Sequence, residues 1–337
     1  MPEQSSANKI HKMVKKFAEG IAKLEKPGLI SHIGPDGDAV GSQLALYYWF
    51  RKLGKEPLLF NDDPVPDNMK WLAGHEIIQP PTEELLEQCD GFLFIDGNEP
   101  SRFGAMSAYF KETRKPVYLV DHHLAPPEDL YRGMLWDGKA SSTGYLVYLL
   151  YEETGMERLT REAAEALYVG ILTDTGSFRF DTVTAETHFA IGNIIRHGGI
   201  NPSEIYSRVY EDKTLAEYHL LGSVLEGIRL FCGGAVAVMQ VTEKMMLENG
   251  CSQDDLEGFV NYPLSIRGVV VALLLYERDG RVKISFRGKS QVDLNQAARK
   301  FDGGGHFNAA GAWHDGPLEK AVKEVVAEIT ALMDDCA

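Results

Sequence analysis

The sequence is poor in cysteine and in basic residues, and it has no long hydrophobic run. Its 4 cysteines form no C-x-x-C pair, which excludes a zinc ribbon and a disulfide framework and fits a reducing cytoplasm. The longest apolar run, 268–276, falls far short of the ~20 residues that span a bilayer, and the N-terminus is polar, so we expect neither export nor membrane anchoring. With 34 Lys and Arg against 49 Asp and Glu, the formal net charge is -15, which argues against a protein that coats long nucleic acid.

Length and composition indicate a folded protein of two domains. The chain has 337 residues, of which 44% are hydrophobic and 25% charged, as in ordinary globular proteins. At roughly 150 residues per domain, two domains are expected. From 27 to 180, short apolar runs alternate with segments of helical period, which predicts a doubly wound parallel sheet. The predicted strands are 29–33, 57–61, 91–96, 117–121 and 168–174.

The pattern changes after the glycines at 198 and 199. The stretch 201–230 is typical of polar helix and is interpreted as a linker. Beyond it come β-rich runs, a helical stretch, a glycine run and an amphipathic helix at 317–333. The prediction is an α/β protein with a doubly wound, mainly parallel sheet in 1–200, a helical linker at 201–230 and a smaller α+β domain in 231–337.

Four of the predicted strands end in carboxylates or imidazoles. These residues are the run His32 to Asp38, Asp96, the triplet Asp121-His122-His123, and Asp174. Because ligands bind outside the carboxyl ends of the strands in open α/β sheets, we expect the four clusters to converge on one crevice. Five carboxylates brought together would repel one another, and divalent cations remove that cost. Imidazole and carboxylate ligands suit Mn²⁺ or Mg²⁺, so the pattern predicts a two-metal centre.

Taken singly, each cluster has an ordinary structural explanation. Asp36 and Asp38 suit a turn, or the N-cap of a helix that begins at Ala39. An Asp after a buried strand is commonly a loop residue, and His122 and His123 suit a structural role. The clusters taken together favour a metal site, because the same residue types follow four separate strands.

The joint pattern resembles the DHH phosphoesterase family, named for the triplet that is Asp121-His122-His123 here. The family's first motif resembles 32–42, its second supplies Asp96, and its fourth is similar to 170–178, GILTDTGSF. Near the C-terminus, 285–287 and the run 301–311, FDGGGHFNAAG, resemble the signature of the DHH-associated C-terminal domain. The resemblance covers nearly the whole chain and is greatest to the compact nanoRNase members of the family.

The resemblance implies a role for each matched residue. One cation is expected at His32, Asp36 and Asp96, and a second at Asp38, Asp96, His122 and Asp174. Asp96 would then bridge two Mn²⁺ ions, with Mg²⁺ as the alternative. His123 is expected to face the phosphate as a hydrogen-bond donor or acid, while Asp121 orients the neighbouring histidines. Water activated by the metals is the expected nucleophile.

The glycine run is predicted to bind phosphate. Gly303, Gly304 and Gly305 leave backbone N–H groups free to approach an anion closely. Arg287 offers a bidentate fork to a terminal phosphate, and His306 a further donor. A flexible turn is the structural alternative.

We therefore expect a cytoplasmic, manganese-dependent phosphoesterase. The resemblance to the nanoRNase members implies two reactions, hydrolysis of short RNA oligomers to mononucleotides and removal of phosphate from 3′-phosphoadenosine 5′-phosphate (pAp). Short RNA and nucleotides are the expected partners, without long duplex nucleic acid or membrane, and a homodimer stays open.

Three alternatives remain at this point. The nearest is a phosphodiesterase for a cyclic dinucleotide or its linear product, because the same catalytic groups suit both kinds of substrate. A pyrophosphatase or polyphosphatase is disfavoured by the glycine-rich second domain. A nucleotide sensor without catalysis is disfavoured because every expected ligand position holds a competent residue.

Overall fold

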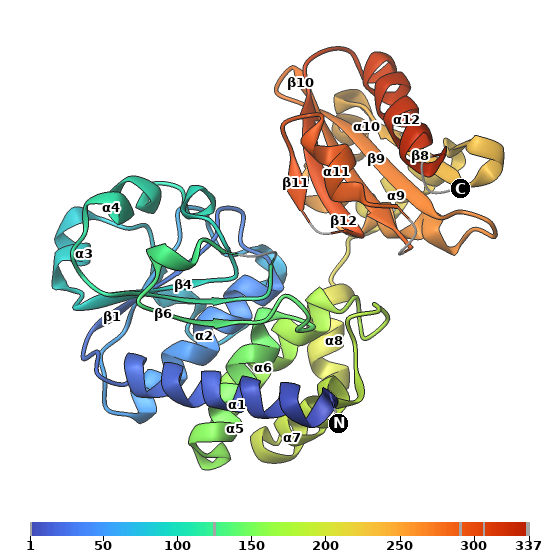
Figure 1. Cartoon of the computed structure of the whole chain (residues 1–337). Coiled ribbons are helices and arrows are strands. Elements are labelled where there is room, and N and C mark those ends of the chain that lie inside the picture. Colours follow the sequence, from blue (N-terminus) through green and yellow to red (C-terminus); the bar gives the residue numbers. More distant parts are fainter. Residues whose placement is uncertain (1, 124–125, 290–291, 306, 335–337) are drawn as a thin grey trace. The chain divides into compact units, whose positions relative to one another are not determined.

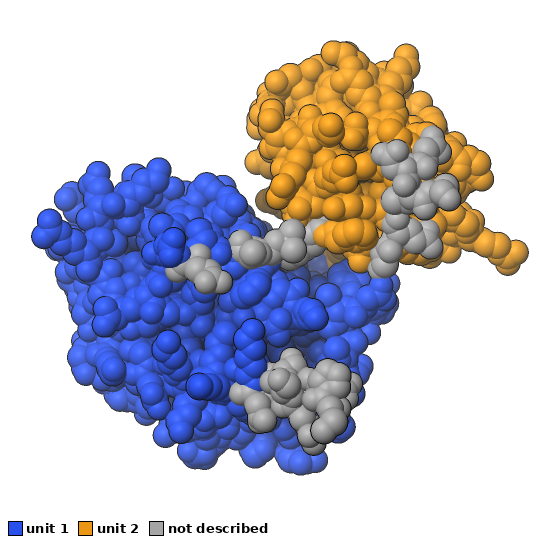
Figure 2. Space-filling view, in the orientation of Figure 1, with its two compact units in different colours: residues 1–212 blue, residues 213–337 orange. Residues whose placement is uncertain are grey.

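The computed structural model describes residues 2–123, 126–289, 292–305 and 307–334. The chain divides into two compact units, 1–212 and 213–337, which are coloured separately in Figure 2. Among the described helices, none is long and apolar enough to cross a membrane.

The first unit is built on a parallel sheet of six strands in the order β3-β2-β1-β4-β5-β6. The strands are β1 (Pro27–Ser31), β2 (Leu58–Phe60), β3 (Ile78–Gln79), β4 (Gly91–Ile95), β5 (Val117–Asp121) and β6 (Gly133–Trp136). The predicted parallel sheet is confirmed, although the sequence analysis did not identify the short strands β3 and β6. The strand order reverses between β1 and β4, and this is where ligands bind in such sheets.

Helices cover both faces of this sheet (Figure 1). The helices of this unit are α1 (Pro2–Ile21), α2 (Gly37–Lys52), α3 (Glu83–Gln88), α4 (Met106–Glu112), α5 (Thr143–Thr154), α6 (Arg161–Asp174), α7 (Ala185–Gly198) and α8 (Pro202–Tyr210). Successive strand residues point to opposite faces. Leu29 and Leu93 pack in the core that α1, α2, α5 and α6 share, whereas Ile30 and Phe94 pack in the core that includes α4 residues. Burial on both faces explains why these strands are continuous apolar runs.

The predicted strand 168–174 is wrong, because these residues are the last turns of α6. Thr160 caps the helix by accepting a hydrogen bond from the Ala163 amide. Most of α6 is buried among α2, α5 and α7, so its apolar residues do not mark a single face. A short run that is apolar on all sides cannot be told from a buried strand by its periodicity. Asp174 therefore reaches the site from the end of a helix.

Helices α2 and α6 pack unusually closely because glycines line their contact. A Cβ placed on Gly41 of α2 would lie 2.4 Å from the carbonyl oxygen of Ala166 on α6. A Cβ on Gly170 of α6 would lie 2.9 Å from an Asp38 side-chain oxygen. This close approach brings Asp38, near the start of α2, toward Asp174, at the end of α6.

The stretch expected as a linker, 201–230, is divided between the two units. Helix α8 packs Ile205 and Val209 into the core of the first unit. Helix α9 (Leu215–Glu226) packs Leu220 and Val224 into a core of the second unit. Each helix has an apolar stripe that must be buried against a neighbour, so the boundary falls between them, at residues 212 and 213.

The second unit is an α+β domain, as predicted. Its sheet has six strands in the order β11-β12-β10-β9-β8-β7, with β8 and β9 parallel and the other neighbours antiparallel. The strands are β7 (Arg229–Phe231), β8 (Val236–Val241), β9 (Val271–Arg278), β10 (Arg281–Gly288), β11 (Gly304–Gly305) and β12 (Ala309–His314). The helices are α9, α10 (Glu243–Asn249), α11 (Leu294–Arg299) and α12 (Leu318–Asp334). Residues of α11 and α12 pack in one core of this unit, and residues of α9 and α10 in another.

Replacing Gly41 with Ala tests the close packing of α2 on α6. The added Cβ would overlap backbone atoms of α6, so we expect the variant to lose about 1–3 kcal/mol of unfolding free energy. Gly192→Ala is the matched control, because Gly192 lies on the exposed side of α7 with nothing within 4 Å of its Cβ position. Because Ala has the higher helix propensity, Gly192→Ala should gain about 1 kcal/mol of unfolding free energy. Urea unfolding followed by circular dichroism measures both, and wild-type stability of Gly41→Ala would contradict the contact.

Candidate metal centre

Acidic and imidazole side chains meet at the carboxyl edge of the first sheet. His32 follows β1, Asp96 follows β4, and His122 follows β5. All three are buried. His32 Nε2 lies 3.4 Å from Asp96 Oδ2, and His122 Nε2 lies 3.7 Å from Asp96 Oδ1. The strands therefore place Asp96 between two imidazoles, at the point where the strand order reverses.

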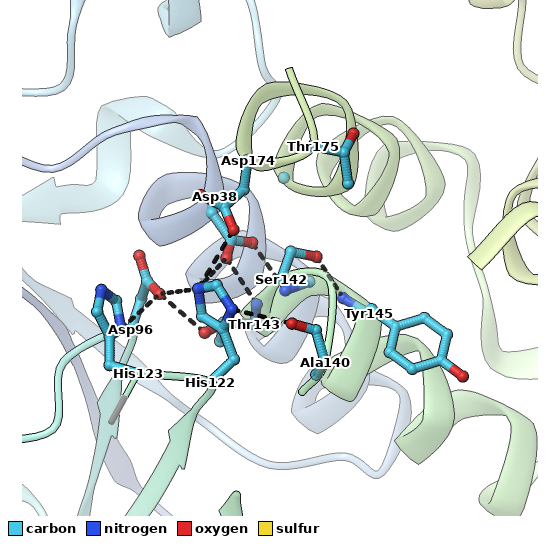
Figure 3. A network of polar contacts seen from close by, with 12 residues as sticks. Asp38, Asp96, His122, His123, Ala140, Ser142, Thr143, Tyr145, Asp174 and Thr175 are labelled. Atoms are coloured by element: carbon cyan, nitrogen blue, oxygen red, sulfur yellow. Dashed lines mark hydrogen bonds and ion pairs between the residues drawn. The ribbon is translucent and has the colours of Figure 1, made fainter. Parts of the chain in front are cut away.

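Two helices bring further carboxylates to the same place. His122 Nε2 lies 3.2 Å from Asp174 Oδ2 at the end of α6 and 3.9 Å from Asp38 Oδ2 near the start of α2. Figure 3 shows these side chains, with Asp96 and His123, pointing toward one another. Asp36 caps α2 by accepting from the amides of Asp38 and Ala39, and its Oδ1 also lies 4.0 Å from His32 Nε2. Asp36 is thus a helix cap and also a member of the site.

The described residues contain three overlapping sets of candidate ligand atoms. Within each set, all the atoms lie within 4.8 Å of one another. The sets are His32, Asp36 and Asp96; Asp38, His122 and Asp174; and Asp96, His122 and His123. The third set shares Asp96 with the first and His122 with the second. Carboxylate and imidazole donors fit a divalent cation such as Mn²⁺ or Mg²⁺.

The ring nitrogens of two histidines are arranged as in metal sites. His32 Nδ1 lies 2.9 Å from the Ile33 carbonyl oxygen, and His122 Nδ1 lies 3.2 Å from the Ala140 carbonyl oxygen. A carbonyl oxygen only accepts, so Nδ1 carries the proton that it donates. In the neutral rings Nε2 then holds a lone pair, and in both rings Nε2 faces the carboxylates.

The carboxyl groups of Asp38, Asp96 and Asp174 respond differently to their surroundings. Burial and the charge of Asp96 raise the pKa of Asp38 well above its usual value. Burial raises the pKa of Asp174 to about 6, against the opposing charge of His122. Burial also acts to raise the pKa of Asp96, but the hydrogen bond and charge of His32, together with the other imidazoles, hold it well below its usual value. Asp96 is therefore the carboxylate that stays ionised most readily.

The two histidines hold protons more tightly than usual. Burial lowers the pKa of His32, but the hydrogen bond to Asp96 and the charges of Asp96 and Asp36 together outweigh this effect, so the pKa is raised. Burial likewise lowers the pKa of His122, but the charges of Asp174, Asp96 and Asp121 and the hydrogen bond to the Ala140 carbonyl oxygen together raise it. Protons on these imidazoles thus offset part of the negative charge of the carboxylates, a charge that a bound cation would also offset.

Asp121 contacts His123 and belongs to none of the three donor sets formed by the described residues. Its Oδ1 lies 2.7 Å from His123 Nδ1, and its Oδ2 accepts from the His123 amide. The indole of Trp136 donates to the His123 carbonyl oxygen over 2.7 Å. These bonds fix the orientation of the His123 ring. Asp121 itself is fully buried, so it acts on its surroundings through this ring.

Sequence reasoning missed the groups that hold Asp38. The amides of Thr143 and Gly144, at the start of α5, donate to the two oxygens of Asp38 over 2.6 and 2.7 Å. The Thr143 hydroxyl also donates to Asp96 Oδ1 over 2.8 Å. The available signal was Ser142, whose position before a helical run predicts an N-cap and hence a helix N-terminus. Nothing in the sequence shows which carboxylate that terminus faces.

The carboxylate Asp96 has a backbone that non-glycine residues seldom adopt. Its φ angle is 61°, in the left-handed region. Asp tolerates this region better than most residues. The conformation turns the chain at the end of β4 while the side chain stays buried between the imidazoles. A bulkier residue there would be strained as well as lacking the oxygens.

The residues predicted to bind phosphate lie together in the second unit. Arg287 of β10 pairs with Ala309 of β12, and Gly305 of the exposed edge strand β11 pairs with Ala310. A Cβ on Gly305, whose φ is 147°, would lie 2.5 Å from the Ala309 carbonyl oxygen. Gly304 and Gly305 are exposed, so their backbone groups are accessible. His306, the other predicted donor, lies outside the described residues.

Comparison with known proteins identifies both units. The DHH family, N-terminal domain, matches residues 28–171, and the DHHA1 domain matches residues 233–335. The bifunctional oligoribonuclease and PAP phosphatase NrnA of Thermus thermophilus is 32% identical over 93% of this chain and 92% of that protein. The Bacillus subtilis protein of the same name is 31% identical over 83% of this chain and 87% of its own.

A solved structure and a more distant sequence relative were also compared with this chain. An exopolyphosphatase-related protein from Bacteroides fragilis has a TM-score of 0.91 at 30% identity, covering 96% of this chain and 97% of that one. The cyclic-di-AMP phosphodiesterase GdpP of Geobacillus thermodenitrificans is 25% identical over 91% of this chain but only 48% of its own length. The family resemblance expected from the motifs is therefore confirmed. The chain belongs to the DHH family and is a phosphoesterase, and thus a hydrolase.

Proposed function

We propose that this protein is a two-metal phosphoesterase that hydrolyses short oligoribonucleotides to mononucleotides and dephosphorylates pAp. The observation that carries the proposal is the set of three overlapping donor groups, joined through Asp96 and His122. Relatives named as oligoribonuclease and PAP phosphatase match along most of this chain. The cyclic dinucleotide alternative has weaker support, because GdpP matches over about half of its own length.

His32, Asp36 and Asp96 would hold one cation, and Asp38, Asp96, His122 and Asp174 the other. Bound there, two divalent cations such as Mn²⁺ would lower the pKa of water and neutralise charge on the phosphoryl oxygens. His123, whose Nδ1 contacts Asp121, would donate a hydrogen bond to phosphate and a proton to the leaving oxygen. Water would be the nucleophile: its attack on phosphorus would form one P–O bond as the bond to the leaving oxygen breaks, with no covalent intermediate.

In the second unit, Arg287 and the amides of Gly304 and Gly305 would bind a terminal phosphate. Gly303, also predicted as a donor, instead donates its amide to the Ala298 carbonyl oxygen over 3.0 Å. The guanidinium gives a paired, charge-assisted contact, and the exposed glycine backbone allows close approach. With a net charge of -15, the chain has no broad attraction for polyanions, so a few local contacts must supply the affinity. Substrates with few phosphates satisfy that requirement.

Release of phosphate and nucleotide tests the proposed substrates. With Mn²⁺ we expect turnover of pAp and of a 5′-phosphorylated diribonucleotide, and none with chelator. Asp38→Asn should lower turnover about a thousandfold, because several kcal/mol of metal stabilisation are lost. Asp67→Asn is the matched control, since Asp67 is an exposed carboxylate paired with Lys70. Faster cleavage of a cyclic dinucleotide or of pyrophosphate, or no cleavage of any of the four, would contradict the proposal.

Metal affinity should fall as the pH falls. The cation binds deprotonated ligands, and protons compete for Asp174, whose pKa is about 6, and for His32 and His122, whose pKa values are raised. Below pH 6 we expect Mn²⁺ affinity to drop by at least about tenfold per pH unit. Isothermal titration between pH 5.5 and 7.5, in buffers of different protonation enthalpy, measures affinity and released protons. Equal affinity across this range would contradict the proposed ligand set.

Arg287→Ala tests the second unit. Loss of a charge-assisted contact of about 1.5–3 kcal/mol should raise KM for the diribonucleotide about 10- to 100-fold with little change in kcat. Arg281→Ala is the control, because it removes the same charge from the same strand. Arg281 pairs with Asp315 and is not part of the proposed phosphate site. Steady-state kinetics of both variants measure KM and kcat. An unchanged KM for Arg287→Ala, or an equal rise for both, would remove Arg287 from the proposed site.

A further inference from the structure

One buried residue hydrogen-bonds to two carboxylates that come from different elements. Thr143, the first residue of α5, donates its amide to Asp38 Oδ2 over 2.6 Å and its hydroxyl to Asp96 Oδ1 over 2.8 Å. Asp38 belongs to α2, and Asp96 follows β4. Figure 3 shows Thr143 next to both carboxylates. Thr143 is completely buried, so it acts on the site through these two side chains.

The two carboxylates differ in the number of other hydrogen-bond donors that contact them. Asp38 also accepts from the Gly144 amide and the Ser42 hydroxyl, both at Oδ1. Among the described residues, the Thr143 hydroxyl is the one donor other than the imidazoles that bonds to the Asp96 side chain. The orientation of Asp96 therefore depends on this hydroxyl more than the orientation of Asp38 depends on the amide.

The hydroxyl bonds to the side of Asp96 that faces the second donor set. Asp96 Oδ2 faces His32, at 3.4 Å. Asp96 Oδ1, which accepts the hydroxyl, faces His122 at 3.7 Å. His122 is shared with Asp38 and Asp174. A shift of Asp96 Oδ1 would therefore disturb this set more than the set around His32.

We propose that Thr143 is a positioning residue that fixes the separation of Asp38 and Asp96, and thereby the place of the cation bound by Asp38, His122 and Asp174. The inference rests on the two-metal function proposed above. Both donors belong to one residue whose branched side chain is stiff about χ1. The distance between the amide nitrogen and the hydroxyl oxygen is therefore set by covalent geometry and this one restricted torsion. Two carboxylates that repel one another are held at that spacing.

Thr143→Val tests the hydroxyl alone, because Val keeps the shape and the amide. Isothermal titration should show two Mn²⁺ ions per wild-type chain, and in the variant a second ion bound about 10- to 100-fold more weakly. Electron paramagnetic resonance at two Mn²⁺ per chain should show a coupled pair in the wild type and isolated Mn²⁺ in the variant. Thr143→Ser, which restores the hydroxyl, should recover the coupled pair. Thr143→Ala gives the same comparison if the Val variant folds poorly.

Ser142→Ala is the matched control for helix stability. The Ser142 hydroxyl caps α5 by accepting from the Tyr145 amide, and it is bonded to neither carboxylate. The control loosens the same helix end without removing the Asp96 contact, so it should bind both ions. If it lost the second ion as Thr143→Val does, helix stability would explain the effect and the inference would be overturned.

The remaining outcomes separate this inference from the function on which it rests. A coupled pair in the wild type and an unchanged pair in Thr143→Val would overturn the role of Thr143 and leave the two-metal function standing. A wild-type chain without a coupled pair would overturn both.

Discussion

Electrostatic repulsion among buried carboxylates is the constraint on which the rest of the first unit depends. Asp38 and Asp96 are almost fully buried, with Asp174 beside them. The imidazoles offset part of this charge only by binding protons, as the raised pKa values of His32 and His122 indicate. Cations at the proposed positions would replace those protons and allow all the carboxylates to be ionised. Local features that are costly by themselves, such as the left-handed backbone of Asp96, are consistent with a structure built around that charge.

Bringing the carboxylates together requires more than a sheet edge. The parallel strands position His32, Asp96 and His122, because their carboxyl ends lie side by side. Asp38 and Asp174 come from helices. They meet because Gly41 and Gly170 let α2 and α6 approach so closely that a Cβ at either glycine would overlap atoms of the other helix. The N-terminus of α5 then supplies two amides to Asp38, where the helix dipole favours a negative charge. The site is therefore formed by a sheet edge, a helix crossing and a helix end.

The sequence predicted what depends on local pattern and missed what depends on packing. Strand ends carrying Asp96 and the triplet at 121–123 were recognisable because apolar runs stop abruptly at polar residues. The segment before Asp174 was misassigned, since a helix buried on all sides has no polar face to reveal its period. Thr143 was missed for a different reason. Its partners, Asp38 and Asp96, are separated from it by 105 and 47 residues, and single-sequence patterns do not show such pairings.

On the proposed function, the two units would recognise phosphate in different ways, and both ways suit a small substrate. The first unit presents buried donor sets suited to cations, so it would bind phosphate through metal charge. In the second, the proposed contacts are the Arg287 guanidinium and the exposed edge at Gly304 and Gly305, which would bind phosphate oxygens without reading a base. Neither mechanism gains from a longer chain, because each further phosphate would meet a protein whose net charge is -15. A long RNA would add repulsion without adding contacts of these two kinds, whereas a nucleotide or a dinucleotide presents the phosphates that such contacts require.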